Sequence, residues 1–184
     1  GRQGLYAWEK LIFQLGLGAL VGYFVFNKGD TPGLSELNAN LNHALNLPFQ
    51  ATYVAEKGVW HVSDKLIYLP MAAFIVLALL MVTGMSNAVN IADGMDGLAA
   101  GITVIVSVGL LVLTYIAGWE TAAQYLLVPA IPEAMELIVL IASVAGACLG
   151  FLWWNCSPAQ VFMGDTGSLA LGGLLAYCAI VVRQ

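Results

Sequence analysis

The chain has 184 residues, of which 60% are hydrophobic and only 9% are charged. Soluble domains carry about 25% charged residues, so the composition excludes an ordinary soluble domain and indicates an integral membrane protein. The formal net charge of −5 argues against nucleic-acid binding, which needs a basic face. Three cysteines without tight spacing (Cys148, Cys156 and Cys178) indicate packing residues rather than a disulfide framework or a zinc site.

Five apolar stretches approach the length of about 20 residues that a helix needs to span a membrane. In chain order they cover roughly residues 8–26, 66–85, 97–117, 134–154 and 167–183. Glycines recur four residues apart at Gly18 and Gly22, Gly97 and Gly101, and Gly146 and Gly150. This spacing lets helix backbones approach closely in lipid. We therefore predict an all-α, polytopic bundle with five transmembrane helices.

The segment between the first two spans, residues 27–65, is too long for a bare loop. Four leucines at helical spacing, Leu34, Leu37, Leu41 and Leu45, predict a short amphipathic helix at the membrane surface. The runs ATYV and VWHV, separated by residues 55–58, predict a small β-hairpin. This part of the chain is expected to fold outside the membrane.

The stretch NAVNIADGMDGLAAG, residues 87–101, follows the uncharged second span and carries four regularly spaced polar groups. They are Asn87, Asn90, Asp93 and Asp96. Each step of three residues turns an α-helix by about 300°, so one straight helix cannot direct all four at one ligand. We expect the asparagines to end the second span and the aspartates to begin the third, with Gly94 and Gly97 permitting a bend. Capping explains one Asp, whereas four polar groups favour a ligand site.

A second cluster lies in WNCSPAQVFMGDTGSLALGG, residues 154–173. Pro158 ends the fourth span, Gly164 permits a tight turn, and Asp165 stands where the last helix begins. A helix N-terminus favours phosphate, and a carboxylate there can hold Mg²⁺, which takes oxygen ligands. Phe162 could stack on a base or anchor the loop in the interface. With five spans, both clusters fall on one membrane face, which indicates phosphate chemistry at a membrane surface.

These two motifs resemble those of the MraY family, the phospho-N-acetylmuramoyl-pentapeptide transferases, which are polyprenyl-phosphate N-acetylhexosamine-1-phosphate transferases. GLYAWEK near the start and TPG after the first span are also similar, whereas Ala92 stands where the family commonly has Thr. The resemblance implies a Mg²⁺-dependent enzyme of peptidoglycan biosynthesis. Such enzymes transfer phospho-MurNAc-pentapeptide from UDP-MurNAc-pentapeptide to undecaprenyl phosphate, giving lipid I and UMP.

The same resemblance assigns roles to individual residues. Asp165 is expected to be the catalytic residue and the metal ligand. The expected substrate-binding residues are Asn87, Asn90, Asp93, Gly94, Asp96, Asn155 and Phe162.

The resemblance also implies a location and partners. It implies the bacterial cytoplasmic membrane, with the active site facing the cytoplasm, residues 27–65 outside, and a homodimer as one assembly. The lysines and arginines of the loops, counted by the positive-inside rule, indicate the opposite orientation, and we follow the resemblance.

The chain starts without Met and is similar to the middle spans of longer family members, so we expect an internal fragment that is inactive alone. Two alternatives stay open. One is a related transferase that uses UDP-GlcNAc. The other is an ion-coupled transporter, although transporters place acidic groups near the membrane midplane and these lie at span ends.

Overall fold

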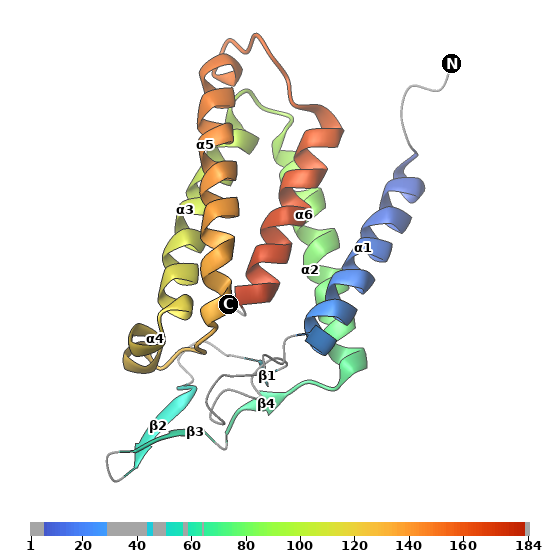
Figure 1. Ribbon diagram of the computed structural model, residues 1–184. Coiled ribbons are helices and arrows are strands. Elements are labelled where there is room, and N and C mark those ends of the chain that lie inside the picture. Colours follow the sequence, from blue (N-terminus) through green and yellow to red (C-terminus); the bar gives the residue numbers. More distant parts are fainter. Residues whose placement is uncertain (1–5, 29–43, 46–50, 57–58, 64, 183–184) are drawn as a thin grey trace.

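The computed structural model describes residues 6–28, 44–45, 51–56, 59–63 and 65–182. Within this part of the chain, five helices are long and apolar enough to cross a membrane (Figure 1). They are α1 (Ala7–Lys28), α2 (Met71–Ala92), α3 (Leu98–Gly118), α5 (Leu137–Asn155) and α6 (Gly164–Val182). The predicted all-α polytopic membrane bundle is thereby confirmed.

The second and last spans have bounds that matter for the site. Helix α2 begins at Met71 behind Pro70 rather than at Leu66, and it continues through both asparagines to Ala92. Helix α6 begins at Gly164, so that Asp165 lies inside its first turn. Gly164 has φ +69° and Gly97, directly before α3, has φ +73°, a conformation that glycine adopts without steric penalty. These two glycines therefore set the direction in which α6 and α3 leave their loops.

Helices α1, α2 and α6 pack side by side, and α3 packs against α5 and α6 (Figure 1). A Cβ added at Gly18 would lie 2.9 Å from Leu79 Cα, and one at Gly22 would lie 3.1 Å from Ile75 Cα. The first predicted glycine pair thus brings the backbones of α1 and α2 together. By contrast, a Cβ at Gly101, Gly146 or Gly150 would meet no described atom within 4 Å, whereas one at Gly97 would lie 3.6 Å from the carbonyl oxygen of Asn155 at the end of α5. Of the other two pairs, only Gly97 therefore comes close to the backbone of another helix.

Helices α2 and α6 approach closely at Gly172. A Cβ added at Gly172 would lie 2.4 Å from the carbonyl oxygen of Met85 and 2.6 Å from Ser86 Cα. The Ser86 hydroxyl donates a hydrogen bond of 3.0 Å across this contact to the carbonyl oxygen of Leu169. In lipid the hydrophobic effect does not drive helices together, so their association depends on small residues that permit close packing and on interhelical hydrogen bonds.

Short elements gather at the end of the bundle where α2 begins and α3 ends (Figure 1). Strands β2 (Tyr53–Glu56) and β3 (Val59–Val62) form the predicted antiparallel hairpin. Strand β1 (Ala44–Leu45) pairs with β4 (Ile67–Tyr68). The remaining elements are α4 (Glu120–Leu126) and a 3-10 turn, η2 (Pro132–Glu136), before α5.

The amphipathic helix expected from the leucine stripe lies mostly outside the described residues. Its last leucine, Leu45, is in strand β1, so the helical prediction is wrong at that residue. The reason is that pairing with β4 satisfies its backbone in place of a helix. The hairpin is tied to the chain after α4, because the N–H of Thr52 donates to the carbonyl of Leu127 at 2.8 Å.

One further expectation fails. Cys148 and Cys178 are buried in their helices, as packing residues should be, but Cys156 is exposed. It directly follows the end of α5, where the chain leaves the bundle and no neighbouring helix covers the thiol.

Candidate functional site

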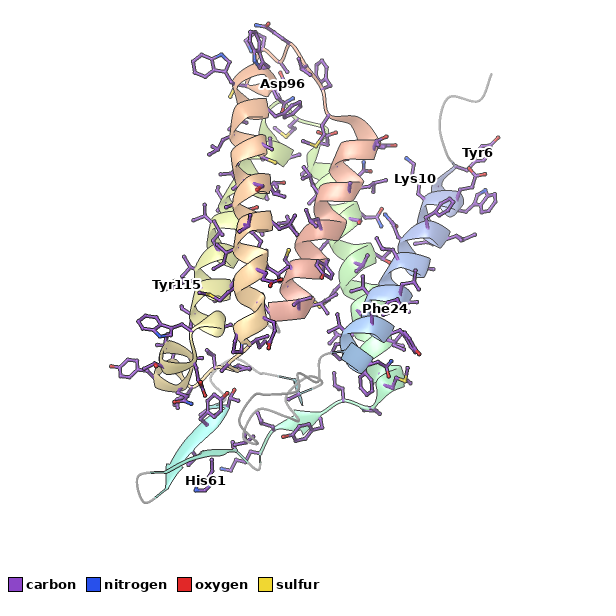
Figure 2. All side chains as sticks on the ribbon, viewed as in Figure 1. Tyr6, Lys10, Phe24, His61, Asp96 and Tyr115 are labelled. Carbon is purple, nitrogen blue, oxygen red and sulfur yellow. The ribbon has the colours of Figure 1, made fainter. Side chains whose placement is uncertain are left out.

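The sequence motifs meet at the end of the bundle opposite the hairpin. In Figure 2, Asp96 lies at one end of the molecule and His61 at the other. Two loops form this end, which we call the site loops: residues 93–97 between α2 and α3, and residues 156–163 between α5 and α6. The start of α1 and the start of α6 lie on the same side (Figure 1).

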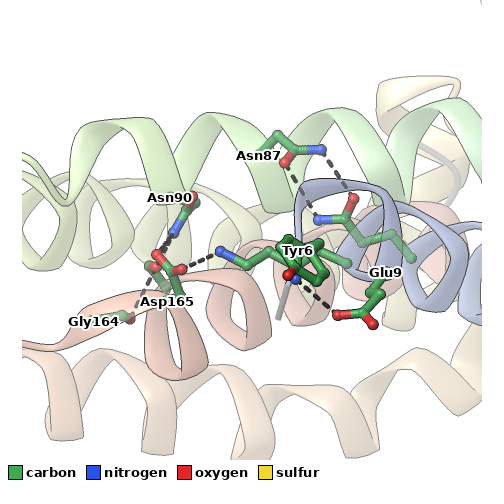
Figure 3. Close-up of polar contacts among 9 residues, drawn as sticks. Tyr6, Glu9, Asn87, Asn90, Gly164 and Asp165 are labelled. Carbon is green, nitrogen blue, oxygen red and sulfur yellow. Dashed lines mark hydrogen bonds and ion pairs between the residues drawn. The ribbon is translucent and has the colours of Figure 1, made fainter. Parts of the chain in front are cut away.

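Asp165 is the centre of a polar cluster built from three helices (Figure 3). The Asn90 amide of α2 donates to Asp165 Oδ1 at 2.8 Å and to Ser168 Oγ at 2.9 Å. The Lys10 ammonium of α1 forms an ion pair with Asp165 Oδ2. The Ser168 hydroxyl donates in turn to the carbonyl of Gly164 at 3.1 Å. Both carboxylate oxygens therefore have partners from other helices.

Asp93 supplies a second carboxylate close to the first. It directly follows α2 as its C-terminal cap, so it does not begin the third span as the sequence predicted. Burial raises the pKa of the Asp93 carboxyl, a hydrogen bond from the N–H of Gly164 lowers it, and the negative charge of Asp165 raises it again. The net pKa lies above the ordinary range because desolvation and a neighbouring like charge both disfavour the ionised form. A cation at this position would relieve the repulsion between the two acids.

Asn87 lies one helical turn before Asn90 but faces a different partner (Figure 3). Its amide donates to Gln14 Oε1 at 3.0 Å, and Gln14 Nε2 donates to Asn87 Oδ1 at 3.4 Å. Asn87 Nδ2 also donates to the carbonyl of Thr83 at 2.9 Å. The structure thus directs Asn87 into the contact between α1 and α2 rather than toward Asp165.

Asp96 and Asn155 connect the two site loops. The N–H of Gly97 donates to Asn155 Oδ1 at 3.1 Å, and Asn155 Nδ2 donates to the carbonyl of Val161 at 2.8 Å. The N–H of Ala159 donates to Asp96 Oδ2 at 3.1 Å. Asn155 is only 5% exposed. Its amide therefore forms hydrogen bonds with backbone groups of both loops and holds the two loops together.

Gly94 and Phe162 lie on the outer surface of the site loops. Gly94 is exposed, and Phe162 is 71% exposed. A ring this exposed is accessible to a planar base or to the membrane interface.

Lys10, Gln14 and Ser168 belong to this site but were not predicted from the sequence. The signal for the first two was available, because Lys10, Gln14, Gly18 and Gly22 recur every four residues and therefore share one face of α1. Ser168 stands three residues after Asp165, which places both near one side of α6.

No group of three His, Cys, Asp or Glu side chains that could hold a metal ion occurs within the described residues. The site instead offers two carboxylates, Asp93 and Asp165, with the Asn90 amide beside them. Mg²⁺ is usually bound in proteins by one or two carboxylates, several waters and a substrate phosphate. These oxygen donors therefore fit a Mg²⁺ site that substrate completes, rather than a site built wholly from protein.

The profile of glycosyl transferase family 4 matches residues 3–183. The chain belongs to this family. The resemblance inferred from the two motifs is confirmed by curated relatives of the family named phospho-N-acetylmuramoyl-pentapeptide-transferase.

Three of these relatives show the extent of the similarity. The chain is 38% identical over 191 residues to the protein of Brachyspira hyodysenteriae and 40% identical over 182 residues to that of Desulfotalea psychrophila. It is 41% identical over 182 residues to that of Thermodesulfovibrio yellowstonii. The matches cover 99–100% of the chain but 44–48% of each relative. This family 4 chain thus spans about half the length of the relatives it matches, and it is a multi-pass membrane protein.

Proposed function

We propose that this protein transfers phospho-MurNAc-pentapeptide from UDP-MurNAc-pentapeptide to undecaprenyl phosphate, giving lipid I and UMP in peptidoglycan biosynthesis. The observation that carries the proposal is the Asp165 cluster, in which three spans bring two carboxylates, an amide and an ammonium to one membrane end. The 38–41% identity to transferases named for phospho-MurNAc-pentapeptide supports the choice of substrate.

In this proposal Asp165 is the catalytic residue, and Asp165 and Asp93 hold Mg²⁺. When bound, the metal would supply positive charge that offsets the charge of the pyrophosphate and polarises its oxygens. Residues of the chain hold the metal-binding groups in position. The Asn90 amide fixes the Asp165 carboxylate through a hydrogen bond of 2.8 Å, which keeps a ligand oxygen in place before substrate arrives. The Lys10 ammonium is a second positive charge beside the same carboxylate.

The nucleotide half of the substrate is assigned to the site loops. Gly94 and Asp96 are exposed in the site loop that follows α2, and Phe162 offers an exposed ring for the base. The N-terminal turn of α6, which contains Asp165, has backbone N–H groups without helical acceptors, and such groups favour phosphate. Asn155 keeps the two loops together beneath these groups.

The place of the cluster at the end of the spans suits a reaction between a water-soluble nucleotide and a lipid. We assign this end to the cytoplasmic face of the bacterial cytoplasmic membrane, and the hairpin end to the outside. Cys156 makes the orientation measurable, because it is exposed at the site end while Cys148 and Cys178 are buried. A membrane-impermeant maleimide should label Cys156 in inverted vesicles and leave it unlabelled in intact cells. The reverse pattern would overturn the orientation.

The activity is tested by UMP release from the full-length protein in detergent with undecaprenyl phosphate. UDP-MurNAc-pentapeptide and UDP-GlcNAc are supplied separately, with Mg²⁺ and with a chelator in its place. Asp165→Asn should abolish release. Glu133→Gln, the same kind of substitution at an exposed position before α5, should not change it.

Each outcome of this assay has a definite meaning. Release with the pentapeptide substrate that depends on Mg²⁺ and Asp165 supports the proposal. Release with UDP-GlcNAc alone keeps the chemistry and overturns the substrate. No release with either substrate from folded protein overturns the transferase and favours the transporter. The implied homodimer stays a prediction, which the mass of the solubilised protein tests.

A further inference from the structure

One face of α1 connects the helix packing of the membrane with the polar cluster. It carries Gly22, Gly18, Gln14 and Lys10, each four residues from the next. Residues at this spacing form a ridge along one side of a helix. The two glycines contact the backbone of α2, Gln14 contacts a side chain of α2, and Lys10 contacts α6.

The contacts of this ridge follow α2 in strict order. A Cβ at Gly22 would lie 3.1 Å from Ile75 Cα, and one at Gly18 would lie 2.9 Å from Leu79 Cα. Gln14 reaches Asn87, farther along α2 toward its C-terminal end. Residue numbers fall along α1 as they rise along α2, so the two helices are antiparallel, and these contacts define their register. The next member of the ridge is Lys10.

The two kinds of contact constrain that register differently. Close packing of glycines fixes how near the helices lie, but an apolar surface tolerates sliding better than a directional bond does. The Gln14–Asn87 pair is directional, because each amide both donates to and accepts from the other. Gln14 is only 8% exposed, so a shifted register would leave a buried amide without its partner, which is unfavourable in an apolar environment.

The register has a direct consequence for the site. A slip of one helical turn moves a residue by about 5.4 Å along the axis. A movement of that size separates Gln14 from Asn87 and draws Lys10 away from Asp165. The amide pair lies one turn from Lys10 on α1 and one turn from Asn90 on α2, and both of these residues contact Asp165.

We infer that the reciprocal Gln14–Asn87 amide pair is a positioning device, which sets the axial register of α1 against α2 and so delivers the Lys10 ammonium to Asp165. Asn87 is then a positioning residue rather than a substrate ligand. This inference rests on the proposed function only for the importance of Asp165. The placement of Lys10 is a property of the folded protein that can be measured without any substrate.

The decisive variant replaces both amides with leucine, Gln14→Leu with Asn87→Leu, in the full-length protein. Replacing both partners of a buried hydrogen bond with apolar groups can be nearly neutral for stability, whereas replacing one leaves the other unpaired. The double variant therefore tests the position of α1 relative to α2 in a protein that should still fold. A swapped variant, Gln14→Asn with Asn87→Gln, restores an amide pair. Ser143→Leu is the control, because Ser143 is exposed in α5 and bonds only to its own helix.

The first readout is the rate at which an amine-directed reagent acylates Lys10, followed by mass spectrometry. Lys65, at the hairpin end of the same molecule, serves as the internal standard. Loss of the ion pair with Asp165 should speed the labelling of Lys10 about fivefold, as an exposed ion pair contributes up to about 1 kcal/mol. The swapped variant should return labelling toward the wild-type rate, and Ser143→Leu should leave it unchanged.

The second readout is kinetic. In the double-leucine variant, kcat for UMP release should fall at least about tenfold while KM for the nucleotide changes little, because a misplaced catalytic group lowers the rate more than binding. A folded double-leucine variant with wild-type Lys10 labelling would overturn the inference. If the wild-type protein released no UMP, the proposed function would fail, yet the labelling result would still decide the register.

Discussion

Gly172→Ala tests whether the contact between α2 and α6 assembles the site. The added Cβ would lie 2.4 Å from the carbonyl oxygen of Met85, whereas ordinary van der Waals contact begins at 3.4 Å. The obstructing atoms belong to the backbone of Met85 and Ser86, which cannot rotate away as a flexible side chain can. The two helices must therefore separate locally by about 1 Å, the difference between these two distances.

A separation of this size should lower both the stability of the protein and the rate of its reaction. The bond between Ser86 Oγ and the carbonyl of Leu169, now 3.0 Å, would lengthen beyond hydrogen-bonding distance. Overpacking of this kind costs about 1–3 kcal/mol, more than the 0.5–1 kcal/mol or so that alanine gains over glycine in a helix. Asn90 would also withdraw from Asp165, 2.8 Å away at present. A misplacement of about 1 Å can lower a rate about a hundredfold.

The assay combines thermal unfolding in detergent with UMP release by the full-length protein. Gly84→Ala is the matched control, because it makes the same substitution on α2 where a Cβ would meet no described atom within 4 Å. The control should be at least as stable as the wild type and equally active. If Gly172→Ala unfolds at the wild-type temperature and releases UMP at the wild-type rate, the close contact does not hold the site together, and the reasoning is refuted.

Substitutions at three further residues probe individual groups of the site. Lys10→Gln should lower the rate of UMP release about a hundredfold, as loss of one charge-stabilising donor does, while Lys10→Arg should retain more activity; equal rates in the two variants would contradict this. Asn155→Ala should lower the free energy of unfolding by about 1–3 kcal/mol, because two hydrogen bonds to backbone groups are lost, each contributing about 0.5–1.5 kcal/mol; an unchanged melting curve would show that water replaces the amide. Since the raised pKa of Asp93 means that its charged form destabilises the fold, Asp93→Asn should raise the melting temperature at pH about 8, and the gain should vanish as the pH falls through that raised pKa. A gain in melting temperature that grew as the pH fell would contradict a raised pKa for Asp93.

Much of the fold could be predicted from the sequence because a membrane imposes simple constraints on it. Spans need about 20 apolar residues, so the helices could be recognised from hydropathy alone. Charged groups are unfavourable in lipid, so Asp93, Asp96 and Asp165 had to lie at span ends, which identified the end of the molecule that carries the candidate site. The hairpin at residues 53–62 followed from its alternation and turn residues.

The bounds of α2 were harder to predict because polar residues are ambiguous at a helix end. Asn87 and Asn90 could have capped the helix, but both lie within it, and α2 continues to Ala92. Their side chains bond to side chains of other helices, and Asn87 also bonds to the carbonyl of Thr83 within α2, rather than to backbone groups at a helix end. That outcome depends on which helix lies opposite, and hydrophobic periodicity carries no information on this.

The sequence alone therefore determined which residues cross the membrane, which stand at its surface, and which of those are chemically able to bind a metal or a phosphate. Only the tertiary structure decided how they are paired. Lys10 meets Asp165 across 155 positions of sequence, and Gln14 meets Asn87 across 73. The physical reason is that periodicity shows which face of a helix is polar, whereas the partner of that face is chosen by the close packing of glycines from different helices and by the register in which those helices lie.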